Sequence, residues 1–497
     1  ALSPPQPFTR DDPAQMTQPT TSPQAGAASH GIIGKFLHLA SAQTIRDILH
    51  TCFFIYLARM DQSHYGEFQL AFNTAMIVLF LGEFGLNQPL VSALSKKYGH
   101  KGDVLMQYTL IKGIILLTGW LGVTAFVYQQ GYTSGLTNLI QVITAGVGLE
   151  ALSSTFFVAC RVQGRQDLEA RIKALGAVCG YGWALATLAM GLQPHWIALF
   201  KLIENGITLV GGAWIAVNKT DVQGLTFKGK ALARTWNTAK GGLVFVFMAF
   251  FSILYNKANL FFLQKFSGPH AVAQYSATWE VVDAIQIPIS SLLMKSVLFP
   301  LFVGLWRHDK EGFDRLKDNS VKWLLWASIP VMFFLAVESD RIIGLIYGKD
   351  YLGAMTLQKW LVPAVAFSFI HNLAAYLMMS QHRQNVLFWI YAGGLALNVT
   401  LCAVLIPRDP LIGAGVAIVG TKGVVALCST FYCQRRMQLI KWRAVAPVLA
   451  ATAVGAALYF GLRLTGVREL AEAGGLAPFA ALGWKWWKEM KAQARPA

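Results

Sequence analysis

The side chains whose chemistry stands out lie in an apolar stretch near the N-terminus. Gln43, Arg46, Asp47 and His50 are spaced three and four residues apart, so they fall on one face of a helix. A charge at mid-bilayer depth is costly and survives mainly where it faces water or a partner. If this stretch crosses a membrane, the polar stripe predicts a helix that faces a cavity within the protein.

Three further apolar stretches carry polar faces, at matching places in the two halves of the chain. They hold Asn73, Glu83 and Asn87 in the second stretch, Ser252, Asn256, Lys257 and Asn259 in the seventh, and Glu280, Asp283, Gln286 and Lys295 in the eighth. The fifth and eleventh stretches have no charged residue in their interiors. This distribution predicts a water-filled cleft between the halves.

A structural role stays open for the charges in these faces. A neighbouring helix could neutralise Arg46 or Asp47 simply to hold the bundle together. Glu280 and Asp283, one helical turn apart, fit a structural hydrogen-bond role as well as a place in the cleft.

Other polar residues favour structural interpretations. Lys201 and Glu204, three residues apart, are more typical of a local ion pair than of a substrate site. His371, beside an asparagine, is more typical of a satisfied buried pair than of a proton relay. The roles of Lys112 and Lys422 stay undecided.

Composition and the lengths of the apolar runs predict that membrane-spanning helices position these residues. The chain of 497 residues is 55% hydrophobic and only 13% charged, which excludes a typical soluble enzyme. Runs of about 20 apolar residues are long enough to cross a bilayer as helices. They fall near 32–58, 64–93, 105–129, 135–160, 173–191, 195–217, 241–264, 271–304, 322–338, 355–380, 385–406, 411–433 and 444–464. A shorter stretch, Leu476 to Trp487, is either a fourteenth span extended upstream or an interfacial helix.

Loop charges predict the orientation. The even-numbered connections and the C-terminal end carry most of the loop lysines and arginines, whereas the odd-numbered connections hold only Arg59, Lys265, Arg341, Lys349 and Arg408. Because basic residues gather on the cytoplasmic side, we expect a cytoplasmic N-terminus. The net charge of +17 is thus explained by topology, and no nucleic acid partner is expected.

We therefore expect an all-α polytopic membrane protein with two six-helix lobes around a central cavity, plus one or two extra C-terminal helices. The expected units are a disordered cytoplasmic tail (1–31), an N-terminal lobe (32–218), a cytoplasmic linker (219–240), a C-terminal lobe (241–433) and a basic C-terminal part (434–497). The connections are too short for catalytic domains, and the chain lacks the Walker, HExxH and GxSxG signatures. We expect a transporter rather than an enzyme, with no cofactor and no metal site.

Three motifs together point to a known family. The first spans Leu57 to Gly99 and contains Arg59, a turn at Tyr65, Gly66 and Phe68, and the element Glu83 to Leu86. The second is Ile342 to Leu361, and the third is Leu395 to Thr421. They resemble the polysaccharide transporter family of the multidrug, oligosaccharidyl-lipid and polysaccharide (MOP) exporter superfamily. Two departures are the segment Tyr255 to Asn259, where the family often has an Arg-x-x-Asp element, and Asp409-Pro410 in place of a turn glycine.

The resemblance implies a flippase of the bacterial cytoplasmic membrane. Such a protein moves a polyprenyl-(di)phosphate-linked oligosaccharide between leaflets by alternating access, for cell-surface polysaccharide synthesis. On this hypothesis Arg46, Lys257 and Lys295 meet the diphosphate, and Gln43, Asn256 and Asn259 contact sugar hydroxyls. The remaining candidates, Asp47, Glu83, Glu280 and Asp283, would balance the cations or bind a coupling proton or sodium ion. Expected partners are the lipid-linked substrate, membrane lipids and polysaccharide-assembly proteins.

Two alternatives belong to other classes. A multidrug and toxin extruder shares the superfamily plan, but its cationic substrates would prefer an acidic cavity. A non-transporting scaffold of an envelope complex is the second, with the proline-rich N-terminal tail and Trp484 to Lys491 as docking segments.

Overall fold

The computed structural model describes residues 43–83, 86–95, 101–222, 225, 227 and 243–493. All regular secondary structure within these ranges is helical, which confirms the all-α prediction. Ten of the described helices are long and apolar enough to cross a membrane. The expected tail (1–31) and most of the expected linker (219–240) lie outside the described residues.

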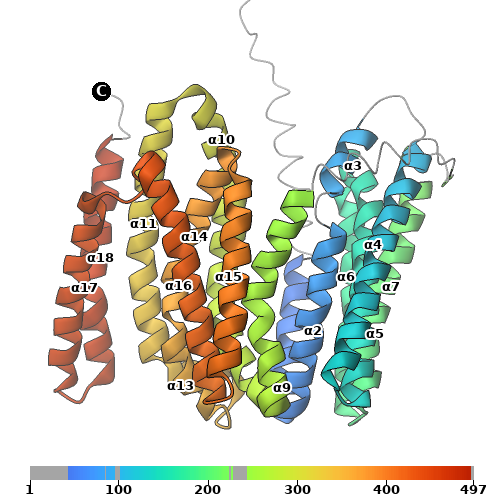
Figure 1. Cartoon of the computed structure of the whole chain (residues 1–497), viewed down its shortest axis with the longest axis horizontal. Helices are drawn as coiled ribbons and strands as arrows, with labels where there is room; N and C mark the ends of the chain where they lie inside the picture. The colour runs from blue at the N-terminus through green and yellow to red at the C-terminus, as the bar shows by residue number, and fades with distance from the viewer. Residues whose placement is uncertain are drawn as a thin grey trace, which may run out of the picture.

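The N-terminal lobe begins with helix 43–60 and forms the blue to light green group in Figure 1. It continues with α2 (Gln62–Glu83), α3 (Asn87–Leu94), α4 (Lys101–Gln130), α5 (Ser134–Val162), α6 (Gln166–Ala189) and α7 (Pro194–Asn218). The expected second span, 64–93, is wrong as a single helix, because α2 ends at Glu83 and the short α3 follows it.

The C-terminal lobe opens with α9 (Leu243–Pro288), a long helix that contains the expected seventh span and the start of the eighth. Gly268 interrupts it with a φ of 74°, in the left-handed region that glycine adopts without strain. The eighth span continues through a π-helical segment, η1 (Ile289–Leu298), into α10 (Phe299–His308). The two expected spans are therefore two helices joined at Gly268, and the 3.8 Å contact between Lys257 and Asp283 shows that they lie side by side.

Six more helices complete this lobe, the yellow to orange group in Figure 1. They are α11 (Lys310–Val337), α12 (Ser339–Tyr347), α13 (Leu352–Leu361), α14 (Pro363–Ser380), α15 (Gln384–Leu405) and α16 (Pro410–Met437). Pro363 separates α13 from α14 inside the expected tenth span, because proline fits the first turn of a helix better than its interior.

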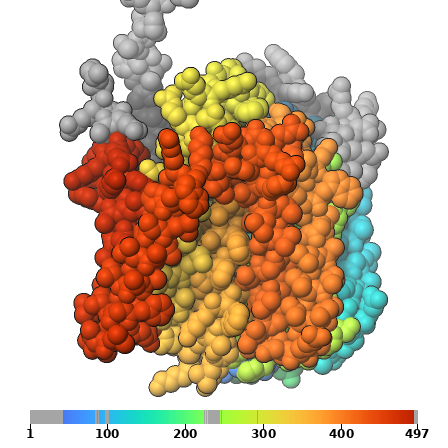
Figure 2. Space-filling view, turned by 60° about the vertical axis from the view of Figure 1, so that its left-hand side comes forward, coloured from blue at the N-terminus to red at the C-terminus, as the bar shows by residue number. Residues whose placement is uncertain are grey.

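Two further helices, α17 (Trp442–Arg463) and α18 (Arg468–Gln493), pack side by side next to α11 and form the red flank in Figures 1 and 2. The Trp326 indole donates to the Phe479 carbonyl at 2.8 Å. At the N-terminal end of α18, Arg468 pairs with Asp340 at 2.8 Å and lowers the pKa of that carboxyl. The short stretch at 476–487 lies within α18, a helix of 26 residues that begins upstream and packs along α17. This helix is not one of the ten that are long and apolar enough to cross a membrane.

The lobes meet closely at the end opposite the basic connections. Helix α2 packs on α9 there, and a Cβ built on Gly66 would lie 2.0 Å from the Pro269 carbonyl oxygen. The Tyr351 hydroxyl donates to the carbonyl of Ala58 at 3.0 Å. Arg59 donates to the carbonyl of Ile346 at 2.8 Å, at the C-terminal end of α12. This end of the molecule is closed by contacts between backbone atoms and side chains of both lobes.

Candidate functional site

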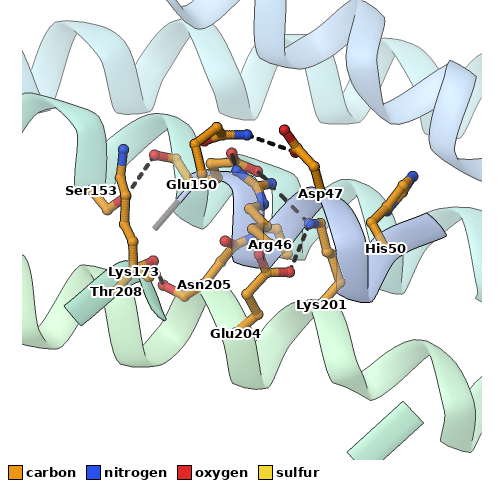
Figure 3. A network of polar contacts seen from close by, with 12 residues as sticks. Arg46, Asp47, His50, Glu150, Ser153, Lys173, Lys201, Glu204, Asn205 and Thr208 are labelled. Carbon is orange, nitrogen blue, oxygen red and sulfur yellow. Dashed lines mark hydrogen bonds and ion pairs between the residues drawn. The ribbon is translucent and has the colours of Figure 1, made fainter. Parts of the chain in front are cut away.

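The first polar cluster surrounds Arg46 inside the N-terminal lobe (Figure 3). The Arg46 guanidinium donates to both carboxylate oxygens of Glu150, at 2.6 and 2.9 Å, and its Nε lies 2.9 Å from Glu204 Oε1. Planar two-bond pairing of this kind fixes both the position and the orientation of an arginine. Arg46 thus points from helix 43–60 toward α5 and α7, as Figure 3 shows.

Close packing of α5 on α7 places the partners of Arg46. Gly146 faces the backbone of Lys201 so closely that a Cβ would lie 2.8 Å from its carbonyl carbon. The Asn205 amide donates to the Gly146 carbonyl at 2.9 Å and ties the two helices together. Glu150 follows Gly146 by four residues on α5, so it lies on the same face, beside Arg46.

Lys201 completes a balanced set of charges. Its ammonium lies 2.8 Å from Glu204 and 3.9 Å from Glu150. Two cations therefore face two carboxylates. The Lys201 and Glu204 side chains are 1% and 3% exposed, whereas Arg46 and Glu150 are 19% and 21% exposed. The expected local Lys201–Glu204 pair is present, but it is also the buried half of a larger network.

The second cluster lines a cavity of about 450 Å³ between the lobes. Asn73, Met76 and Phe80 of α2 form the N-terminal side, and residues of α9, η1, α14, α15 and α16 form the rest. Within it, the Lys257 ammonium lies 3.8 Å from the Asp283 carboxylate, across the kink of α9. A polar cavity at the lobe interface is therefore present, where the polar faces of the second, seventh and eighth stretches predicted a cleft.

Lys422 of α16 enters the same cavity from the opposite wall. It donates to Gln286 Oε1 at 3.2 Å and to Ser368 Oγ at 2.9 Å, and its side chain is buried. Its ammonium lies 4.9 Å from the centre of the Trp279 ring, and that of Lys257 lies 5.8 Å from the same ring. Among the described residues, no carboxylate lies within 4.0 Å of Lys422. The lining therefore has two cations and one carboxylate, a surplus that suits an anion.

The two lobes differ in how they neutralise corresponding helices. In the N-terminal lobe the fourth and sixth expected spans, α5 and α7, supply Glu150 and Glu204. In the C-terminal lobe the corresponding helices, α14 and α16, supply Ser368 and the cation Lys422 instead. The N-terminal cluster is thus internally paired, whereas Lys422 of the C-terminal cluster has no carboxylate within 4.0 Å among the described residues.

Some of the predicted site residues line the interface cavity, and others lie around Arg46 in the N-terminal lobe. Asn256 lines the cavity beside Lys257 and Asp283, with its amide donating to the Ser252 carbonyl at 2.7 Å. Gln43 donates to Asp47 at 2.8 Å, one turn from Arg46 and on the exposed side of helix 43–60. The structure thus groups Lys257, Asp283 and Asn256, and it places Arg46 in a separate network.

Four other predicted residues lie elsewhere. Asn259 is fully buried and donates to the Ala414 carbonyl at 2.6 Å, so it joins α9 to α16 within the lobe. Glu280 is exposed on α9 but lies within electrostatic reach of Lys257 and Asp283, so it is a second carboxylate beside this cluster. Lys295 is exposed on the π-helical segment. Glu83 ends α2, within electrostatic reach of Lys112 and Arg161.

Sequence reasoning missed Glu150 and left Lys422 undecided. Both are single charges in the interiors of apolar stretches, and that is the signal by which they could have been found. His371 is a satisfied buried residue, as expected, with its ring nitrogens 3.0 Å from the hydroxyls of Ser429 and Tyr391.

Residues 32–306, more than half of the length of the chain, match the family described as polysaccharide biosynthesis protein. The chain belongs to this family. Its curated relatives include the probable low-salt glycan biosynthesis flippase Agl15 of Haloferax volcanii, 20% identical over 417 residues that cover 83% of this chain and 85% of the relative.

Solved structures of the MOP superfamily have the same fold as this polysaccharide biosynthesis family member. The lipid II flippase MurJ in an inward closed conformation superimposes with a TM-score of 0.69 at 12% identity, over 91% of this chain and 99% of MurJ. An inward-facing multidrug resistance MATE transporter gives a TM-score of 0.64 at 15% identity, over 81% and 98%. The predicted superfamily and fold class are confirmed, and these relatives are flippases and transporters rather than enzymes.

Proposed function

We propose that this protein is a flippase for a polyprenyl-(di)phosphate-linked oligosaccharide, moving it across the membrane by alternating access of the two lobes. The observation that carries the proposal is the interface cavity, in which Lys257 and Lys422 face a single lining carboxylate, Asp283. A phosphate group is an anion that such a surplus attracts. The named flippases among the relatives support the same class of substrate.

The cavity suggests how the parts of this substrate are held. The phosphate meets Lys257 and Lys422, and sugar hydroxyls bond to the amides of Asn73, Asn256 and Gln286. The polyprenyl tail stays in lipid, where its apolar surface costs nothing to solvate. Asp283 balances Lys257 when the site is empty, which prevents a bare pair of lysines in the membrane.

An extruder of organic cations is disfavoured by the same cavity. Its substrates would meet Lys422, which has no carboxylate within 4.0 Å among the described residues, and this ammonium group would repel a cation. The resemblance to MATE transporters is therefore one of fold.

The test is the leaflet distribution of lipid-linked oligosaccharide in a deletion strain complemented with variants. Lys422→Met removes the charge and keeps the length of the side chain, so export should fall at least about tenfold while membrane protein levels persist. Lys359→Met is the matched control, because Lys359 is exposed on α13 and forms no ion pair with a described residue. Normal export with Lys422→Met would remove this lysine from the site, and an unchanged lipid distribution in the deletion strain would end the flippase proposal.

We further propose that the protein lies in a bacterial cytoplasmic membrane with both ends cytoplasmic. The concentration of lysine and arginine at one end of the bundle supports this orientation, and an even number of spans, with α18 as the last, would place both ends there. A reporter active only in the cytoplasm should therefore be active when fused after residue 493. The same reporter inserted at Gly466, between α17 and α18, should be silent; activity at Gly466 and silence at the C-terminus would invert the topology.

A further inference from the structure

A second cavity lies at the basic end of the C-terminal lobe, away from the lobe interface. It has a volume of about 520 Å³ and opens among the α10–α11 connection, the α14–α15 turn and the C-terminal end of α16. Figure 2 views this side of the molecule, with the α10–α11 connection in yellow above the orange helices. Its charged lining residues are Lys310, Asp314, Lys317, Arg383, Arg436 and Lys441.

The lining carries a large excess of positive charge. Lys317 is 2% exposed and is held by Asp314 and the Met437 carbonyl, both at 2.6 Å. Lys441 is held by Asp318 at 2.6 Å. Both lysines are thereby fixed in place at the wall of the cavity.

Three cations remain without a carboxylate partner in the described part of the chain. They are Lys310, Arg383 and Arg436, and all three are exposed at the cavity. They come from three different connections, so the fold brings together residues that are up to 126 positions apart. Three unpaired cations around one cavity form a site for an anion with several oxygens, such as a phosphate ester.

Aromatic residues indicate the depth of this cavity in the membrane. Trp306 lines it and is 37% exposed, and Trp442 follows Lys441 and is 72% exposed. The Arg435 guanidinium lies over the Phe431 ring, 4.4 Å from its centre. Exposed tryptophans and arginines beside aromatic rings are typical of the level of the lipid headgroups. The anion present at that level is the headgroup of an acidic phospholipid.

We propose that this cavity is a binding site for the headgroup of an acidic phospholipid of the adjacent leaflet, separate from the substrate cavity. A lipid bound there links the α10–α11 connection to the end of α16, two segments at the basic end of the C-terminal lobe. This inference goes beyond the proposed flippase activity and does not depend on it, because the two cavities share no lining residue.

The test uses the purified full chain in detergent, with thermal unfolding followed at rising concentrations of short-chain phosphatidylglycerol or phosphatidylcholine. Phosphatidylglycerol should stabilise the protein in a saturable way, and phosphatidylcholine of the same chain length should not. The triple variant Lys310→Gln, Arg383→Gln, Arg436→Gln should need at least about tenfold more phosphatidylglycerol, since each basic residue near a membrane surface contributes on the order of a fivefold factor. The variant Arg165→Gln, Arg171→Gln, Lys219→Gln removes the same charge from the basic end of the N-terminal lobe and should behave as the wild type.

Three results would overturn the proposal. They are equal stabilisation by the two lipids, an unchanged response of the first triple variant, or displacement of phosphatidylglycerol by micromolar inorganic pyrophosphate, which would assign the cavity to a soluble phosphate. If the first triple variant unfolds without lipid, the single variant Arg383→Gln replaces it, with an expected weakening of at least about threefold. The side chain of Arg383 is exposed, so this change should leave the fold intact.

Discussion

Gly66→Ala should reduce export to background while the protein remains in the membrane. The added Cβ would lie 2.0 Å from the Pro269 carbonyl oxygen and 2.8 Å from its carbon, and these backbone atoms cannot rotate away as a side chain can. The lobes would have to separate at the end that Arg59 and Tyr351 close. Alanine favours a helix over glycine by about 1 kcal/mol, so local helix stability would oppose, not cause, the loss. The leaflet assay for lipid-linked oligosaccharide measures the effect.

Gly122→Ala is the matched control for this prediction. Gly122 lies in α4, and a Cβ there would meet no heavy atom within 4 Å. Reaction of a cysteine placed at Ala58 with a membrane-impermeant maleimide, in a cysteine-free background, adds a direct readout, because Ala58 is 3% exposed at the closed end. Its reaction should accelerate with Gly66→Ala and stay slow with Gly122→Ala. Wild-type export and slow labelling in both variants would show that this close contact is not needed for the cycle.

Arg46→Met should abolish export and also destabilise the N-terminal lobe by about 3 kcal/mol, the usual cost of breaking a buried ion pair. Without Arg46, the carboxylates of Glu150 and Glu204 face Lys201 alone, which leaves one negative charge uncompensated. The added variant Glu150→Gln removes that excess, since Lys201 and Glu204 then form a neutral pair. Thermal unfolding measures the stability, and the leaflet assay measures export.

The double variant separates two roles for Arg46. If Arg46 contacts the substrate, Arg46→Met with Glu150→Gln should recover most of the lost stability and none of the lost export. If export returns together with stability, Arg46 only holds the bundle together, and the cationic role falls to the lysines of the interface cavity. The single variant Glu150→Gln completes a double-mutant cycle with the wild type, Arg46→Met and the double variant. The coupling energy between Arg46 and Glu150 follows from these four stabilities.

The sequence predicted the helices and their polar faces, but it did not predict which residues of other helices contact those faces. The spacing around Arg46 indicates a side chain that faces something polar, and the structure supplies Glu150 and Glu204. Glu150 lies 104 residues away on α5, and local periodicity carries no information about which helix packs opposite. The family resemblance helped with the order of the helices, and it gave no residue contact.

Lys422 and Asn259 also show that residue spacing does not predict which helix a side chain contacts. Lys422 has no polar neighbour at helical spacing that marks a cavity face, and only the packing of α16 beside α9 and α14 brings it to Trp279 and Ser368. Asn259 lies at the correct spacing after Asn256, yet the rotation of α9 directs it to α16. The polar face of a helix is a sector about 100° wide, so residue spacing alone does not tell whether a side chain on that face enters the cavity or contacts a neighbouring helix.

The attachment of α17 and α18 has a consequence for the surrounding bilayer. Arg468 and Trp326 fix this pair to the C-terminal lobe, so it must travel with that lobe whenever the lobes rotate. In the proposed alternating-access cycle, the moving body would be wider on one side, and each cycle would displace more acyl chains around the C-terminal lobe than around its partner. Lateral pressure and bilayer thickness would therefore act on the two lobes unequally, and the speed of the cycle should follow the lipids on the α17–α18 side.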